Sequence, residues 1–152
     1  MEQNVAAFKI IGISIESTNE GGKSIEDMGK LWGKFYADGI SEKIPNKASE
    51  EIYSIFTDYE SDYTGKYRVI IGHKVNSLEN MPNGLVGREF EGGKYIKLIA
   101  KGEMPNAIVD TWKKIWEDND KLNRRYTADF EVYGAKSQNG AESEVDVYIA
   151  IE

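Results

Sequence analysis

The sequence of 152 residues contains no cysteine and only one histidine, His73. The lack of cysteine excludes disulfides, thiolate nucleophiles and thiolate metal sites. A single imidazole also excludes metal centres built from several histidines. We expect His73 itself, which follows Gly72 at the end of a predicted strand, to lie on the surface. The sequence thus predicts neither a metal site nor a cofactor.

Long hydrophobic runs are also missing, since no apolar stretch approaches the ~20 residues of a membrane span. The N-terminus lacks the charged and then hydrophobic regions of a signal peptide. We therefore expect a cytoplasmic protein that does not enter a membrane. Positive charge is scarce, because 19 Lys and Arg face 26 Asp and Glu for a net charge of −7. This balance disfavours nucleic-acid binding, and no helix-turn-helix segment is found, so we expect no direct contact with DNA.

Aromatic residues are plentiful, with three Trp, nine Tyr and five Phe, and 40% of the residues are hydrophobic. This is enough for one domain with a core of its own. Alternating and helical periodicities predict six strands and two helices. The strands are expected at 8–16, 51–58, 67–75, 95–100, 128–133 and 145–151, and the helices begin near Ser24 and Pro105.

The element order is β-α-β-β, twice, with half-repeats of about 1–78 and 79–152. The repeat is visible in the residues: 31–36 corresponds to 111–116, and 55–59 corresponds to 129–133. Each half is too small to bury its sheet face alone, so the two should pack around a pseudo-two-fold axis. We predict an α+β fold in which one curved, mainly antiparallel sheet carries both helices.

Glu131 is the central candidate for a binding site. In a strand over 128–133, Glu131 and Tyr133 share one face, and the apolar Phe130 and Val132 share the other. An acid beside a phenol is useful if that face is a cleft and means little on an open surface. A solvated strand face is the ordinary alternative, because glutamate is rarely buried unpaired.

The repeat extends this site to its counterparts in the first half. It matches Thr57 with Glu131 and Tyr59 with Tyr133, so a cleft at the axis would be lined by all four. Tyr148 alternates with its apolar neighbours and points either into the cleft beside Glu131 or to solvent.

Two helical aromatic stripes are typical of a core, but tryptophan faces also stack ligands and cations. We therefore expect Trp32 and Trp112 to serve both the core and the cleft wall. No residue is assigned a catalytic role. The candidate ligand-binding residues are Glu131, Tyr133, Trp112, Trp116, Trp32, Tyr36, Tyr148, Thr57 and Tyr59.

An ordered set of short motifs spans nearly the whole chain. They are residues 59–62, 67–72, 82–85, 93–95 with 101–102, the helix segment 112–116, and 128–133. In this order they resemble the GyrI-like small-molecule-binding family, which forms the effector-binding domain of AraC-type and MerR-type bacterial regulators and also occurs alone. The resemblance implies a ligand cleft between the halves. It also implies that Glu131 is a buried acid that meets cationic, lipophilic ligands.

Three functions remain open at this point. The first is a stand-alone protein that binds a cationic or aromatic small molecule. The second is a hydrolase of strained electrophiles in which the same glutamate acts as general acid or base. The third is a protein-binding inhibitor of DNA gyrase. A separate regulator protein is a further candidate partner, and the sequence leaves monomer and dimer open.

Overall fold

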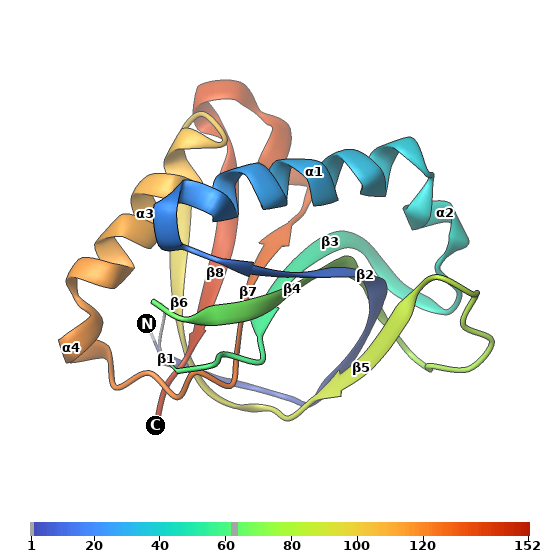
Figure 1. Ribbon diagram of the computed structural model, residues 1–152, viewed down its shortest axis with the longest axis horizontal. Helices are drawn as coiled ribbons and strands as arrows, with labels where there is room; N and C mark the ends of the chain where they lie inside the picture. The colour runs from blue at the N-terminus through green and yellow to red at the C-terminus, as the bar shows by residue number, and fades with distance from the viewer. Residues whose placement is uncertain (1, 62–63) are drawn as a thin grey trace.

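A computed structural model describes residues 2–61 and 64–152. Asp62, the last residue of the motif at 59–62, lies outside the described residues. Eight strands form one antiparallel sheet in the order β1-β6-β8-β7-β3-β4-β2-β5, and the long helices lie along one side of it (Figure 1). The strands are β1 (Glu2–Val5), β2 (Phe8–Thr18), β3 (Lys47–Thr57), β4 (Lys66–Val75), β5 (Val86–Phe90), β6 (Gly93–Lys101), β7 (Ala128–Tyr133) and β8 (Glu144–Ala150).

Two long helices, α1 (Lys23–Ala37) and α3 (Asn106–Glu117), were predicted, and each is followed by a one-turn helix that was not, α2 (Ile40–Lys43) or α4 (Asn119–Leu122). The long helices are amphipathic. Helix α1 buries Leu31 and Phe35, and α3 buries Ile108 and Ile115. Across the ranges 2–61 and 64–152, no helix combines the length and apolarity needed to cross a membrane.

The duplicated α+β fold is confirmed by the order of the strands. A pseudo-two-fold axis passes between β7 and β3, so that β6-β8-β7 on one side mirrors β2-β4-β3 on the other. The two strands that sequence periodicity did not predict are short. Each of them pairs with a strand of the opposite half: β1 of the first half pairs with β6 of the second, and β5 of the second half pairs with β2 of the first. This exchange ties the halves into one sheet.

The close approach of strands β2 and β4 at the centre of the first half requires glycine. Gly12 of β2 lies opposite Gly72 of β4. A Cβ at Gly12 would stand 2.1 Å from the carbonyl oxygen of Ile71, and one at Gly72 would stand 2.1 Å from that of Ile11. Any side chain at either position would therefore push the two strands apart.

The sheet is strongly curled. On the face away from the helices, the ring of Phe8 in β2 lies 5.2 Å from the ring of Phe130 in β7, although β4 and β3 lie between these strands in the sheet. Such contact requires the sheet to close on itself around a second apolar layer. Burying each of these aromatic rings contributes about 1.5–3 kcal/mol.

His73 is buried, and its predicted surface location is wrong. The residue is 1% exposed. It lies on the interior strand β4, where α2 covers it. Its Nε2 is 2.7 Å from Ser41 Oγ, and its Nδ1 is 2.9 Å from the carbonyl oxygen of Glu51. A carbonyl only accepts, so Nδ1 carries the proton and Nε2 accepts from the serine. The two hydrogen bonds of the imidazole thus link α2 to strand β3 of the sheet.

Candidate functional site

A cleft of about 610 Å³ lies between the two long helices and the sheet. Both halves of the molecule contribute to its walls. Most of its lining is apolar or aromatic, a usual composition for a small-molecule site. Helix α1 supplies Ile25, Met28 and Trp32, helix α3 supplies Ile108, Val109, Trp112 and Trp116, and the sheet supplies Phe56, Tyr67, Glu131 and Tyr133.

Glu131 is the acid of this cleft. It is 3% exposed. The indole Nε1–H of Trp112 donates to Glu131 Oε2 over 2.6 Å, and the Tyr133 hydroxyl donates to Oε1 over 2.7 Å. Burial raises the pKa of Glu131 to about 7, although these two hydrogen bonds pull it down. Within the described part of the chain, no lysine or arginine forms an ion pair with Glu131.

Asp129, two residues earlier on the same face, has a full set of partners. Arg124 Nη2 forms a 2.7 Å ion pair with Asp129 Oδ2, and both side chains are almost fully buried. The Tyr59 hydroxyl donates to the same oxygen, and the backbone N–H of Ala150 donates to Oδ1. The two buried acids of β7 therefore differ: Asp129 is ion-paired with Arg124, and Glu131 is hydrogen-bonded but forms no ion pair with any of the residues that the structure describes.

The aromatic walls repeat across the pseudo-two-fold axis. Trp32 of the first half meets Tyr133 of the second edge to face, with ring centroids 5.0 Å apart. Trp112 of the second half meets Phe56 of the first in the same manner, at 5.3 Å. The expected equivalence of the two tryptophans is confirmed by these reciprocal contacts.

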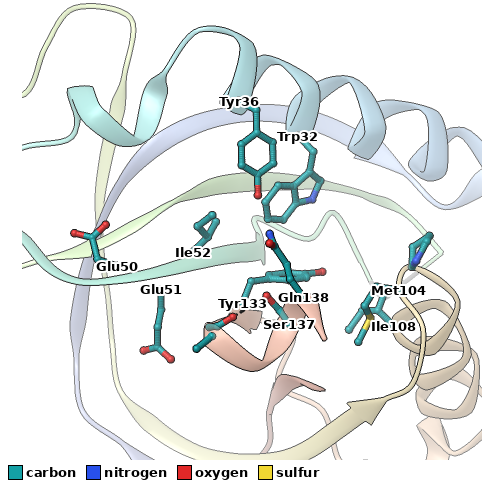
Figure 2. Close-up of a pocket in the computed structure, with 13 residues that line it drawn as sticks. Trp32, Tyr36, Glu50, Glu51, Ile52, Met104, Ile108, Tyr133, Ser137 and Gln138 are labelled. Carbon is teal, nitrogen blue, oxygen red and sulfur yellow. Dashed lines mark hydrogen bonds between the residues drawn. The ribbon is translucent and has the colours of Figure 1, made fainter. Parts of the chain in front are cut away.

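A second cavity, of about 830 Å³, adjoins the cleft (Figure 2). The two share four lining residues: Trp32, Pro105, Ile108 and Tyr133. Tyr36 belongs to this second cavity and is 59% exposed. Its ring stacks on Trp32 at 6.0 Å.

Thr57 does not face the cleft, and its predicted place beside Glu131 is wrong. The strands β3 and β7 pair with Ser54 opposite Glu131 and Thr57 opposite Ala128. Thr57 therefore points to the other face of the sheet, where its hydroxyl donates to the carbonyl oxygen of Thr127. The residue that does stand opposite the acid is Ser54, which is fully buried.

Tyr148 also lies on the other face of the sheet, so of the two alternatives that the sequence left open, the place in the cleft beside Glu131 is ruled out. Glu131 pairs with Val147, whereas Tyr148 pairs with Phe130. The Tyr148 ring stacks on Phe130 at 4.7 Å. It belongs to the inner layer of the curled sheet.

The remaining candidates lie where the prediction placed them. Trp32, Trp112, Trp116, Tyr59, Glu131 and Tyr133 all line the cleft. Tyr59 reaches it because Asp58 has a left-handed backbone, with φ of 52°, which breaks the alternation after β3. Sequence reasoning missed the Arg124–Asp129 pair. The signal for it in the sequence was a basic pair, Arg124 and Arg125, a few residues before a strand whose second residue is an acid.

Comparison with known proteins gives the same fold. An integron cassette protein from Vibrio cholerae, VCH_CASS2, superposes with a TM-score of 0.79 at 29% identity, over 100% of this chain and 95% of that one. SAV2435, whose structure was determined bound to tetraphenylphosphonium, superposes with a TM-score of 0.83 at 16% identity, over 100% and 93%. The protein YobU of Bacillus subtilis, named as a candidate transcriptional regulator, is 22% identical over 124 residues, which are 80% of this chain and 78% of YobU.

The family match covers nearly the whole chain, from residue 3 to residue 151. Its members are described as integron-associated effector binding proteins. The expected relationship to GyrI-like effector-binding domains is thereby confirmed, and so is the class of function, the binding of a small-molecule effector. The chain belongs to the Cass2 family of integron-associated effector binding proteins.

Proposed function

We propose that this protein is a stand-alone binding protein that holds a lipophilic cation in the cleft between its two halves, with Glu131 as the polar contact. The single observation that carries the proposal is the contrast on β7. Asp129 is neutralised by Arg124, whereas the hydrogen bonds that Glu131 accepts from residues in 2–61 and 64–152 come from the neutral side chains of Trp112 and Tyr133.

The energetics favour a cationic ligand. A buried carboxylate loses hydration worth several kcal/mol, and two neutral hydrogen bonds restore part of it. A cation entering the cleft supplies the missing counter-charge. The loss of one partner of such a buried pair costs about 2–5 kcal/mol, so Glu131 should dominate the affinity for charged ligands.

The aromatic walls of the cleft suit the lipophilic groups of such a cation. Trp112 donates a hydrogen bond to Glu131 and also presents its aromatic ring to the cleft. The ring centroids of Trp112 and Trp116 are 6.4 Å apart. Rings of this kind bind cations and planar groups. The structure of SAV2435 with tetraphenylphosphonium, a lipophilic cation, supports the proposal, because that protein has the same fold.

The test is a comparison of two probes of similar shape. Tetraphenylphosphonium carries the charge, and triphenylphosphine oxide is a neutral aryl phosphorus compound. We expect wild type to bind the cation more tightly, and Glu131→Gln to lose about 2–5 kcal/mol toward the cation while its affinity for the neutral probe is unchanged. Equal effects of the variant on both probes would contradict the proposal.

A second candidate is acid-base catalysis at the same residue. The observation that favours it is the pKa of Glu131, about 7, together with the 2.7 Å hydrogen bond from Tyr133. A group that titrates near neutrality is suited to act as general acid or base. Incubation with styrene oxide tests it: a diol product that wild type releases and Glu131→Gln does not would favour the enzyme.

A further inference from the structure

Few charged side chains line the cleft, and they are unevenly paired. Among the described residues of its lining, three carry a charged group: Glu131, Arg124 and Lys113. Arg124 is paired with Asp129. Neither Glu131 nor Lys113 forms an ion pair with any residue in the ranges 2–61 and 64–152. The cleft therefore contains one acid and one ammonium group, and neither is neutralised by the described part of the chain.

Lys113 lies on the side of α3 that faces the cleft. Residues three or four apart on a helix share one side. Lys113 follows Val109 by four residues and precedes Trp116 by three, and both of these residues line the cleft. The core of the protein takes a different side of α3, through Ile108 and Ile115. Since Lys113 itself is exposed, its ammonium group lies at the rim of the cleft and stays in contact with water.

Trp112 links the acid to the lysine. Its indole donates to Glu131 over 2.6 Å, and the next residue of α3 is Lys113, whose Cα lies about 3.8 Å from that of Trp112. Glu131 is 3% exposed, so the acid lies at the floor of the cleft and the lysine at its rim. A ligand whose cation pairs with Glu131 beside the Trp112 ring therefore has its outer end close to Lys113.

We propose that Lys113 binds an anionic group at the outer end of the ligand, so that the cleft recognises zwitterions with a lipophilic cation at one end and a carboxylate at the other. This inference rests on the proposed binding of a cation at Glu131. Like charges repel and opposite charges attract, so the lysine disfavours a second positive group at the rim and favours a negative one. Among lipophilic cations, the cleft thus selects those that also carry a negative group.

The experiment uses phosphonium ions that differ only at the end of one chain. (ω-Carboxybutyl)triphenylphosphonium is a zwitterion at pH 8, and pentyltriphenylphosphonium is the monocation in which a methyl group replaces the carboxylate. The ω-carboxyheptyl and octyl compounds form a second pair with a longer reach. Calorimetry gives the zwitterion-to-monocation affinity ratio for each pair. Because Lys113 is exposed, Lys113→Met should lower this ratio about two- to fivefold for at least one chain length, and it should not weaken either monocation.

Three further variants control the result. Lys114→Met removes the same charge from the next residue of α3, which lines neither cavity, and should leave both ratios unchanged. Lys113→Arg keeps the positive charge and should keep both ratios near their wild-type values. Glu131→Gln should weaken the zwitterions and the monocations together.

Two outcomes separate this inference from the proposed function. If Lys113→Met lowers neither ratio more than Lys114→Met does, the role of Lys113 is wrong even when Glu131→Gln weakens all four ligands. If Glu131→Gln fails to weaken the monocations, the proposed function is wrong instead.

Discussion

Trp112 donates its indole N–H to Glu131 over 2.6 Å, from helix α3 to the centre of the sheet. One side chain therefore serves as a wall of the cleft and as a partner of its acid. A cation that stacks on this ring arrives next to the carboxylate. The hydrogen bond also fixes the acid in place before any ligand enters, which lowers the entropic cost of binding.

The two buried acids of β7 should respond in opposite ways to neutral replacement. Glu131→Gln removes an uncompensated buried charge, so the ligand-free protein should be as stable as wild type or more so at pH 8. Asp129→Asn leaves Arg124 buried without its partner and should cost about 3–5 kcal/mol. Urea unfolding of both variants measures this, and a loss of stability in both would show that Glu131 is a structural residue.

The stability of the ligand-free protein should also depend on pH through Glu131. Its pKa rises from 4.5 in the unfolded chain to about 7 in the folded protein. The contribution of protonated Glu131 to the stability of the fold is therefore fully present below pH 4.5 and is lost as the pH rises through 7. The free energy of unfolding should differ by up to about 3 kcal/mol between these two limits. Melting temperatures of wild type and Glu131→Gln from pH 5 to pH 8 measure it, and identical slopes would contradict the raised pKa.

Strand alternation was sufficient to predict the central part of the site. It placed Glu131 and Tyr133 on one face, and the structure joins them by a hydrogen bond. The helical stripes placed Trp32 and Trp112 toward the same space. These predictions succeeded because a period of two or 3.6 is a local property of the chain and does not depend on its partners.

Register across the sheet could not be predicted in the same way. Aligning the halves by residue type put Thr57 in the place of Glu131, whereas the residue that pairs with Glu131 in the structure is Ser54, three residues earlier. Because side chains alternate, an error of an odd number of residues reverses the face. The burial of His73 was missed, and the direction of Tyr148 was left open, for a related reason: tertiary packing decides which elements flank and cover a residue.

His73 should oppose Glu131 in the pH dependence of stability. Burial lowers the pKa of His73 below its ordinary 6.5. The contribution of neutral His73 to the stability of the fold is therefore present above pH 6.5 and is lost as the pH falls below that value. In the Glu131→Gln background the opposing effect is absent, so the melting temperature should fall between pH 7 and pH 5. Adding His73→Gln should flatten that decrease, and an unchanged slope would count against the assignment.

Duplex DNA should not bind at physiological salt. The chain carries a net charge of −7, and binding to the phosphate backbone depends on clustered positive charge. Fluorescence anisotropy with a labelled duplex of mixed sequence tests this directly. Micromolar affinity that weakens as salt rises would contradict the expectation. Without such affinity, an effect on transcription would require a separate DNA-binding partner.

Cation binding should release a proton near neutral pH. The empty cleft holds Glu131 with a pKa of about 7, whereas a bound cation requires the carboxylate form. The affinity for tetraphenylphosphonium should therefore rise with pH up to about 7 and level off above it. Below that value it should fall by about tenfold per pH unit. Glu131→Gln should show weak binding with no such dependence.

Calorimetry separates this proton release from a general effect of pH on the cleft. At pH 6 most of the wild-type protein holds the proton on Glu131, so binding of tetraphenylphosphonium should release nearly one proton to the buffer. The apparent enthalpy should then differ between phosphate and imidazole buffers by the difference in their ionisation enthalpies. At pH 8.5 the carboxylate is already charged, and the enthalpy should no longer depend on the buffer. Triphenylphosphine oxide, which has no charge to neutralise, should release no proton at either pH. A buffer-independent enthalpy for the cation at pH 6 would mean that Glu131 is already ionised in the empty protein, and that its burial is compensated without a ligand.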